Sequence, residues 1–337
     1  STPALSKQRS CYITYTNHNT HDLLRSGFDR SPMFNGSIKS VGPRYCPSVE
    51  DKVHRFSEKE RHQIFVEPEG WNTVEVYVNG FSTSLPEDVQ FKALSSVPGF
   101  ENVKFFRPGY AIEYDYFPPT QLNYSLETKL VENLYFAGQI NGTTGYEEAA
   151  SQGLMAGINA HLKINGKPPF ILKRDQAYIG VLIDDLITKG TEEPYRMFTS
   201  RAEHRILLRQ DNADLRLTKK GYDIGLASEK RFEQMREKQR QLNLLINDLQ
   251  QKKVDPELAN PMLEAHGTAG IQHRTTLNKL VKRPQLDINH LKEIGPDYAN
   301  YLNKYDEKII ESADIHIKYE DYIDKEMKLA QKMAELE

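Results

Sequence analysis

Residues 134–162 predict a strand, a glycine-rich loop and a helix in direct succession. Leu134–Ala137 is a short apolar segment, residues 138–145 contain three glycines, and alanine and glycine make the following helix, Tyr146–Leu162, unusually thin. A thin helix can approach a sheet or a ligand closely, and the backbone N–H groups of such a loop can bind an anionic or polar group. Simple close packing of the helix is the alternative explanation of the same pattern.

The chain up to about Pro119 predicts a small antiparallel sheet with short helices between its strands. Branched and aromatic residues favour the strands, and Asn79-Gly80 is typical of a tight hairpin turn. Val74, Val76 and Val78 alternate along the third strand, which indicates a sheet with one buried face. The expected strands are Tyr12–Thr16, Gln63–Val66 and Thr73–Val78, and the expected helices are Thr20–Ser26 and Leu85–Ser96.

The chain after residues 166–169, a predicted linker rich in proline, is largely helical and charged. Ser228 suits the N-cap of a long helix that extends to about Lys253. A second amphipathic region extends from Gly295 to Glu337. One face of the long helix is predicted to be buried, because its apolar residues recur at helical spacing. These residues are Phe232, Met235, Leu242, Leu245 and Leu249.

The composition narrows the class of protein. The chain has 337 residues, enough for two or three domains, and only two cysteines, Cys11 and Cys46. So few cysteines predict free thiols in a reducing compartment, and we expect a cytoplasmic protein. No run of 18 apolar residues occurs, which argues against a membrane protein. The formal net charge of −3 gives no general attraction to nucleic acid, so any RNA contact must use local basic patches.

Cys46 lies between two prolines in the segment Gly42–Lys52. Ser48 and the acidic residue three positions later resemble the start of a helix. The thiol would then lie near a helix N-terminus, where backbone N–H groups favour a thiolate, and Arg44 and Lys52 would add to this effect. A buried cysteine that acts only as a small apolar residue is the alternative.

Residues 195–218 interleave arginines with acidic and aromatic residues. Arg201, Arg205 and Arg209 are four residues apart, so we expect them on one face of a helix. Such a row can bind phosphate groups. The alternative is that the arginines form structural ion pairs with nearby acidic residues, namely Glu203, Asp211 and Asp214.

Three blocks of sequence occur in order along the chain: Gly42–Ser48, Phe136–Ala150 and Tyr195–Glu203. In composition and spacing they resemble the MnmG (GidA) family, the FAD-dependent tRNA uridine 5-carboxymethylaminomethyl modification enzymes. The resemblance covers nearly the whole chain. It implies an α/β plus α fold with a β-rich insertion domain, part of a Rossmann-like FAD-binding domain of the glutathione-reductase type, and a C-terminal helical domain.

The resemblance assigns these domains to residues 1–119, 120–165 and 166–337. The first would be an inserted α/β domain with an antiparallel sheet, and the second the returning strand and helix of the FAD-binding domain. The third would be a helical domain that binds tRNA or a partner protein. The family's Gly-x-Gly-x-x-Gly motif is not found in this sequence, and family members continue beyond the position of Glu337. We therefore expect an internal fragment that is inactive by itself.

For the intact enzyme, the resemblance implies addition of a carboxymethylaminomethyl or aminomethyl group to C5 of a tRNA wobble uridine. It further implies FAD as cofactor, NADH as reductant, a folate as one-carbon donor, a homodimer and the GTPase MnmE as partner. Cys46 matches an essential cysteine of the family. We expect it to add to C6 of the uracil, which makes C5 nucleophilic, although carrying the one-carbon unit or transferring a proton would use the same thiol.

The resemblance also predicts binding residues, and no metal site is expected. FAD would contact Gly138, Gln139, Gly145, Tyr146 and Glu147. NAD would contact Gly42, Arg44, Tyr45, Ser48, Asp51, Lys52 and Phe56. tRNA would contact Arg196, Arg201, Arg205, Arg209 and Arg216. Two other functions stay open: an NAD(P)H–flavin thiol oxidoreductase that uses Cys46, and a non-catalytic scaffold that binds tRNA or a partner.

Overall fold

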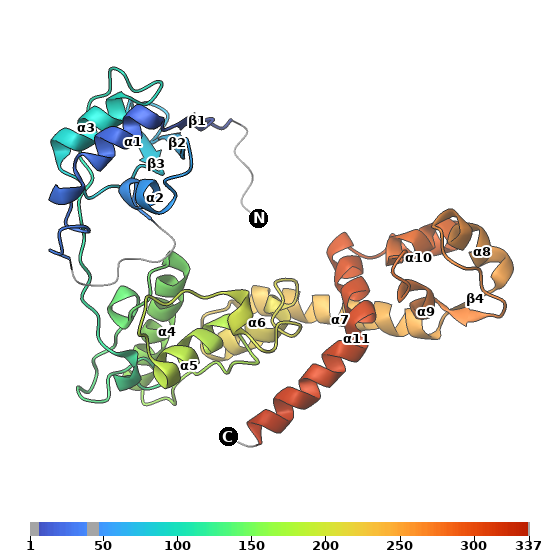
Figure 1. Ribbon diagram of the computed structural model, residues 1–337. Helices are drawn as coiled ribbons and strands as arrows, with labels where there is room; N and C mark the ends of the chain where they lie inside the picture. Colours follow the sequence, from blue (N-terminus) through green and yellow to red (C-terminus); the bar gives the residue numbers. More distant parts are fainter. Residues whose placement is uncertain (1–6, 39–46, 336–337) are drawn as a thin grey trace. The chain divides into compact units, whose positions relative to one another are not determined.

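The computed structural model of the chain describes residues 7–38 and 47–335 (Figure 1). It divides into two compact units. The first comprises the chain up to Pro168 together with Leu186–Arg196, and the second comprises Pro169–Asp185 together with Met197–Glu337. The first boundary between them falls inside the predicted linker at residues 166–169.

The first unit contains a three-stranded antiparallel sheet in the order β1-β2-β3. Its strands are β1 (Tyr12–Tyr15), β2 (Gln63–Pro68) and β3 (Val76–Asn79). The sequence predicts all three, but β3 begins later than expected, and Val74 before it is 88% exposed. The predicted hairpin turn at Asn79-Gly80 is wrong, because residues 69–75 connect β2 to β3 and Gly80 follows the last strand of this sheet.

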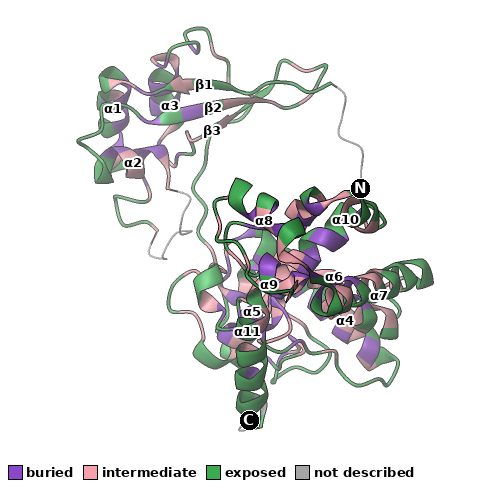
Figure 2. Ribbon diagram, turned by 90° about the vertical axis from the view of Figure 1, so that its right-hand side faces the viewer, coloured by how far each residue is buried: buried purple, intermediate pink, exposed green. Residues whose placement is uncertain are grey.

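Three helices form the core of this part with the sheet: α1 (His18–Arg25), α2 (Val49–Arg55) and α3 (Glu87–Ser95). A short 3₁₀ helix, η1 (Phe28–Arg30), follows α1. Ile64 of β2 and Leu24 of α1 are fully buried, and Figure 2 shows buried stretches on the helices. Ser48 begins α2 as the sequence predicts, since its Oγ accepts a hydrogen bond from the Asp51 amide at 3.2 Å.

The rest of the first unit is built around α4 (Tyr146–Ile164), whose start the sequence predicts. Two short 3₁₀ helices precede it, η2 (Pro119–Gln121) and η3 (Gln139–Asn141). The predicted strand at Leu134–Ala137 is wrong. Among the described residues this segment pairs at an isolated bridge between Glu127 and Tyr135, and a strand requires a ladder of such bonds with a neighbour.

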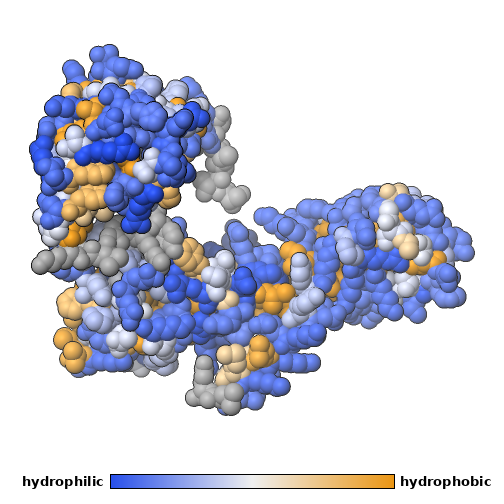
Figure 3. Space-filling view, viewed as in Figure 1, coloured by the Kyte–Doolittle hydropathy of each residue, from blue (hydrophilic) through white to orange (hydrophobic). Residues whose placement is uncertain are grey.

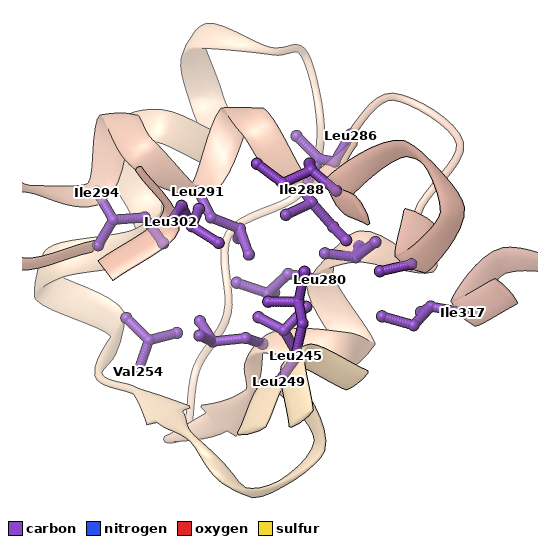
Figure 4. Close-up of a cluster of buried hydrophobic side chains, with 14 of the residues drawn as sticks. Leu245, Leu249, Val254, Leu280, Leu286, Ile288, Leu291, Ile294, Leu302 and Ile317 are labelled. Carbon is purple, nitrogen blue, oxygen red and sulfur yellow. The ribbon is translucent and has the colours of Figure 1, made fainter. Parts of the chain in front are cut away.

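The second unit is helical, and Ser228 begins its long helix α7 as predicted, with its Oγ accepting from the Arg231 amide. Leu245, Leu249, Leu280 and Leu291 lie at the centre of its core (Figure 4). The elements in chain order are α5 (Tyr178–Lys189), whose last residues belong to the first unit, η4 (Thr199–Arg201), α6 (Ala213–Asp223), α7 (Glu229–Gln251), β4 (Lys253–Val254), α8 (Pro256–Ala265), β5 (Thr275–Thr276), α9 (Leu277–Val281), η5 (Ile288–Ile294), α10 (Pro296–Leu302) and α11 (Glu307–Ala334).

The surface in Figure 3 is mostly hydrophilic, with small hydrophobic patches. Among the described residues, no helix combines the length and the apolar character needed to cross a lipid bilayer. Apolar side chains are nevertheless exposed on α11, where Tyr322 is 63% and Met327 57% exposed. The structure is thus a mixed α/β fold whose larger apolar clusters lie inside the two units.

We expect Leu245→Ala to lower the free energy of unfolding of the second unit by about 2–5 kcal/mol, because it removes a fully buried side chain and leaves a cavity. Leu244→Ala is the matched control, since the neighbouring Leu244 is 44% exposed, and it should cost about 0.5 kcal/mol or less. Urea unfolding followed by circular dichroism measures both. Equal losses for the two variants would contradict the assigned core.

The first unit should lose stability on acidification, because two buried histidines, His21 and His62, lie side by side. Burial, and then the charge of His62, lowers the pKa of His21, and burial, and then Lys52, lowers the pKa of His62. Both rings are therefore neutral in the folded state over a range where the unfolded chain binds protons. Their stabilising contribution is present above about pH 6.5 and is lost as the pH falls below it.

The measurement is the thermal midpoint between about pH 8 and about pH 5, followed by the fluorescence of Trp71, the single tryptophan of the chain. His62→Leu should flatten this pH dependence, whereas replacing the exposed His18 should not. A midpoint that does not fall on acidification would refute the prediction.

Candidate functional site

The carboxamide of Gln152, a fully buried residue of α4, orders the loop that precedes its own helix. Its Oε1 accepts hydrogen bonds from the Gly138 amide at 3.1 Å and from Asn141 Nδ2 at 2.8 Å. Its Nε2 donates to Thr143 Oγ1 at 2.9 Å and to the Glu148 carbonyl at 3.0 Å. One side chain therefore connects the start and the middle of the loop to the first turn of α4 and stabilises the shape of the loop.

Two glycines allow the loop to turn sharply. Gly138 and Gly142 have φ values of +87° and +77°, a region that favours glycine. Space is also limited, because a Cβ on Gly142 would lie 2.6 Å from Thr191 Oγ1. Gly142 accepts a hydrogen bond from the Tyr195 amide at 2.8 Å, so the segment that carries Tyr195 lies directly against the loop.

The loop ends at Gly145, the N-cap of α4, which has no side chain to cap the helix. A Cβ on Gly145 would lie 1.7 Å from Glu148 Oε2, so the Glu148 carboxylate lies directly against the backbone of this position. Glu148 is 3% exposed, and its Oε1 lies 3.7 Å from Arg196 Nε. Nearby, the buried atoms Asn141 Oδ1 and Thr144 Oγ1 have no hydrogen-bond partner among the described residues.

The segment around Cys46 is described only from Pro47 onward, so Gly42, Arg44, Tyr45 and Cys46 lie outside the described residues. The other predicted NAD contacts, Ser48, Asp51, Lys52 and Phe56, lie on or beside α2. Asp51 Oδ1 accepts from Arg55 at 2.7 Å, Lys52 donates to the Gly80 carbonyl at 3.0 Å, and Phe56 is 44% exposed. A fully buried acid that sequence reasoning missed, Glu50, accepts two hydrogen bonds from Ser84.

The arginine segment does not form the predicted helix. After η4 the chain runs through turns to α6, so the expectation that Arg201, Arg205 and Arg209 share a helical face is wrong. The reason is that polar contacts hold this segment in an irregular shape. Arg209 binds Asp211 and the Ile206 carbonyl.

Two further predicted tRNA contacts in this segment are partly engaged inside the second unit. Arg216 donates to Asn212 Oδ1 and to the carbonyls of Gln176 and Arg209, and burial lowers its pKa. Arg201 lies 3.8 Å from the buried Asp185. Arg205, in contrast, is exposed and forms no ion pair with the described residues.

Arg174, which sequence reasoning missed, organises this part of the unit. Its guanidinium forms ion pairs of 2.6–2.8 Å with Asp184, Asp185 and Glu203, and it also donates to the Arg201 carbonyl. Burial lowers the pKa of Arg174, but its bonds to the three carboxylates outweigh this effect and raise the pKa above its usual value. Of the ion pairs predicted within this segment, Arg209–Asp211 is observed, whereas Glu203 pairs with Arg174 and Asp214 with Lys238, both from outside it.

Comparison with known proteins gives a consistent picture. The family model described as glucose inhibited division protein A matches residues 1–168, and the model for the C-terminal helical domain of the tRNA modifying enzyme MnmG/GidA matches residues 229–327. The chain belongs to the MnmG/GidA family. The comparisons thus confirm the resemblance of the three blocks.

Relatives and solved structures support this assignment. The tRNA uridine 5-carboxymethylaminomethyl modification enzymes MnmG of Cytophaga hutchinsonii and Flavobacterium johnsoniae are 64% and 66% identical to this chain over its whole length. GidA of Aquifex aeolicus has a TM-score of 0.79 at 44% identity and covers 99% of the chain. The chain spans about half the length of these proteins, 54% of each relative and 51% of the Aquifex chain.

The predicted flavin residues of this MnmG/GidA chain are now placed. Gly138 and Gly145 are buried parts of the loop, whereas Gln139, Tyr146 and Glu147 are exposed, Tyr146 by 93%. Sequence reasoning missed the residues that hold the loop, Gln152, Asn141 and Thr143. One signal in the sequence could have indicated Gln152: it is a glutamine among the small residues of a helix predicted to pack closely. A glutamine that is buried in such a helix needs hydrogen-bond partners.

In the described part of the chain, one group of side chains has the composition of a metal site: His266, His290 and Glu293, whose donor atoms lie within 4.8 Å of one another. Its contacts explain the group without a metal. His290 Nδ1 accepts from the Asp287 amide at 2.9 Å in the capping box of η5, which puts the proton of a neutral ring on Nε2. His266 Nε2 and Glu293 Oε2 bind each other at 2.8 Å.

We expect Gln152→Leu to lower the free energy of unfolding by about 1–3 kcal/mol, because it removes four buried hydrogen bonds and leaves the Gly138 amide without its partner. Gln139→Leu, at an exposed glutamine in the same loop, is the control and should cost about 0.5 kcal/mol or less. Thermal unfolding compares the two. A neutral Gln152→Leu variant would show that the network does not stabilise the unit.

Proposed function

We propose that this protein is part of a flavin-dependent enzyme that modifies C5 of a tRNA uridine. Its family membership and the names of its relatives support this function. The observation that carries the proposal is the arrangement at the start of α4. There, a loop ordered by Gln152 leads to an uncapped helix N-terminus beside a buried Asn141 Oδ1 that has no partner among the described residues.

The residues of this loop fit FAD. The first N–H groups of α4 and the positive end of its dipole favour an anionic or polar edge of a ligand. A ligand N–H group would satisfy Asn141 Oδ1, and the exposed Gln139 and Tyr146 are available for contact. Bound FAD supplies redox chemistry that amino-acid side chains do not. Gln152 keeps the loop in this shape through its four hydrogen bonds.

Cys46 is the proposed nucleophile. Thiolate addition to C6 of the uracil would make C5 nucleophilic toward a one-carbon unit, for which we propose a folate donor. Helix α2 begins three residues after Cys46, and a helix N-terminus lowers the pKa of a nearby thiol. NADH would reduce the flavin, with the segment Gly42–Phe56 as its proposed binding region.

The arginine segment is the proposed contact with the tRNA backbone. Arg205 is the strongest candidate, because it is exposed and forms no ion pair with the described residues. Arg196, Arg201, Arg209 and Arg216 stay predicted contacts, although each already has a partner within its own unit. Homodimer formation and association with the GTPase MnmE are further proposals for the full-length enzyme.

A chimera tests the proposed function. This chain would replace the matching half of the Cytophaga hutchinsonii relative, to which it is 64% identical. We expect the chimera to restore 5-carboxymethylaminomethyluridine in the tRNA of a strain that lacks the endogenous enzyme, measured by mass spectrometry of tRNA nucleosides. Cys46→Ser should abolish the modified nucleoside while the chimera still binds tRNA and flavin.

Cys11→Ser is the matched control, because Cys11 is the other cysteine of the chain and is exposed. It should leave the modification unchanged. A Cys46→Ser chimera that still modifies tRNA would refute the role of Cys46. A wild-type chimera that folds and binds flavin but never modifies tRNA would refute the proposed function.

A further inference from the structure

The β1–β2–β3 sheet has one face covered by its own helices, and the other face is open as far as residues 7–38 and 47–335 show. Strand residues alternate between the two faces. Ile64, Val66 and Val78 point toward the core that α1, α2 and α3 share with the sheet. Their neighbours along the strands therefore point to the opposite face, where no buried hydrophobic residue of this core lies.

The open face is aromatic. Tyr15, Phe65 and Tyr77 come one from each strand, and they are 36%, 38% and 55% exposed. Ile13, directly opposite Phe65 in the register, is 54% exposed. Glu67, opposite Tyr77, is the acidic residue of this face, and its Oε1 accepts a hydrogen bond from Asn79 Nδ2 at 3.0 Å.

Cations lie at both ends of the aromatic face. At one end, the Arg61 guanidinium lies 4.3 Å from the ring centroid of Tyr15. At the other end, Trp71 lies in the connection between β2 and β3, and Lys7 and Arg9, which precede β1, lie 5.5 and 5.9 Å from the centroid of its ring. Arg9 also donates to the Trp71 carbonyl at 3.1 Å. Trp71 is itself 50% exposed.

We propose that this face, Tyr15, Phe65 and Tyr77 with Arg61 and Arg9 at its ends, binds unpaired bases of single-stranded RNA. Aromatic rings exposed on an open sheet can stack bases of any sequence, and guanidinium groups at the ends can bind the phosphates that connect these bases. Strand β2 extends about 17 Å, which suits the two or three bases that such sheets stack.

The proposal rests on the proposed function and extends it. Chemistry at C5 of a uridine requires a base that has left its stack, and the neighbouring bases of the same loop of RNA then need a surface. The sheet would hold those neighbours. A second copy of this chain would be the other occupant of an exposed aromatic face, and the test below distinguishes the two.

The experiment titrates the 337-residue chain with a short, unstructured RNA oligonucleotide rich in uridine. Binding is measured by fluorescence anisotropy of the labelled RNA and by quenching of Trp71, the single tryptophan. We expect Phe65→Ala and Tyr77→Ala each to weaken RNA binding about tenfold. Tyr77→Phe keeps an aromatic ring and should bind RNA like the unmodified chain, whereas Tyr77→Leu should bind as weakly as Tyr77→Ala. Arg61→Gln should reduce the salt dependence of binding, because it removes one phosphate contact.

Tyr322→Ala is the matched control, since this tyrosine of α11 is similarly exposed but lies in the other unit. It should bind RNA like the unmodified chain. Circular dichroism and the emission of Trp71 verify that each variant folds, and the conservative pair at Tyr77 separates loss of stacking from loss of structure.

Several outcomes would overturn the inference. They are no RNA binding by the chain, an affinity of Phe65→Ala and Tyr77→Ala equal to that of the unmodified chain, and binding without a change in Trp71 fluorescence. If the same variants change sedimentation of the chain but not its affinity for RNA, the face is a self-association surface instead. Each of these results leaves the tRNA-modifying function intact if the chimera with the Cytophaga relative is active.

Discussion

Gln152 makes four hydrogen bonds that connect the sharp turn of residues 138–145 to the first part of α4, and the buried Gly138 amide is one of the groups that it pairs. An unpaired buried group costs about 1–3 kcal/mol, so this carboxamide stabilises the turn by pairing the Gly138 amide. The loop of residues 138–145 then determines where α4 begins and which backbone N–H groups its first residues present. The start of α4, the proposed flavin contact, thus depends on a residue two turns farther along the same helix.

The block Tyr195–Glu203 makes contacts in both units, which explains its mixture of residue types. Its first residues belong to the first unit, where the Tyr195 amide binds the Gly142 carbonyl and Arg196 approaches Glu148. Its later residues belong to the second unit, where Glu203 pairs with Arg174. Charged side chains in this block therefore determine local structure, and few of them are available for a ligand.

Local signals in the sequence were enough to predict the parts of the fold that depend on neighbouring residues. Ser48 and Ser228 begin helices because their hydroxyl groups reach amides three residues away. The strand at Leu134–Ala137 and the helix through Arg201–Arg209 failed because both depend on distant partners. A strand requires a paired neighbour, and Arg174, 29 residues from Glu203, holds the arginine segment in turns. For the same reason the sequence indicated the exposed Gln139 and missed the buried Gln152.

His204 and Glu326 bind each other at 2.7 Å although 122 residues separate them. His204 follows directly after the Tyr195–Glu203 block and is 4% exposed, whereas Glu326 lies far along the 28-residue helix α11. A helix of that length is a rigid rod of about 42 Å. Ile309, Ile310 and Ile317 anchor the first part of α11 in the hydrophobic core, so the His204–Glu326 contact fixes the second part of the same helix to the residue that follows the Tyr195–Glu203 block.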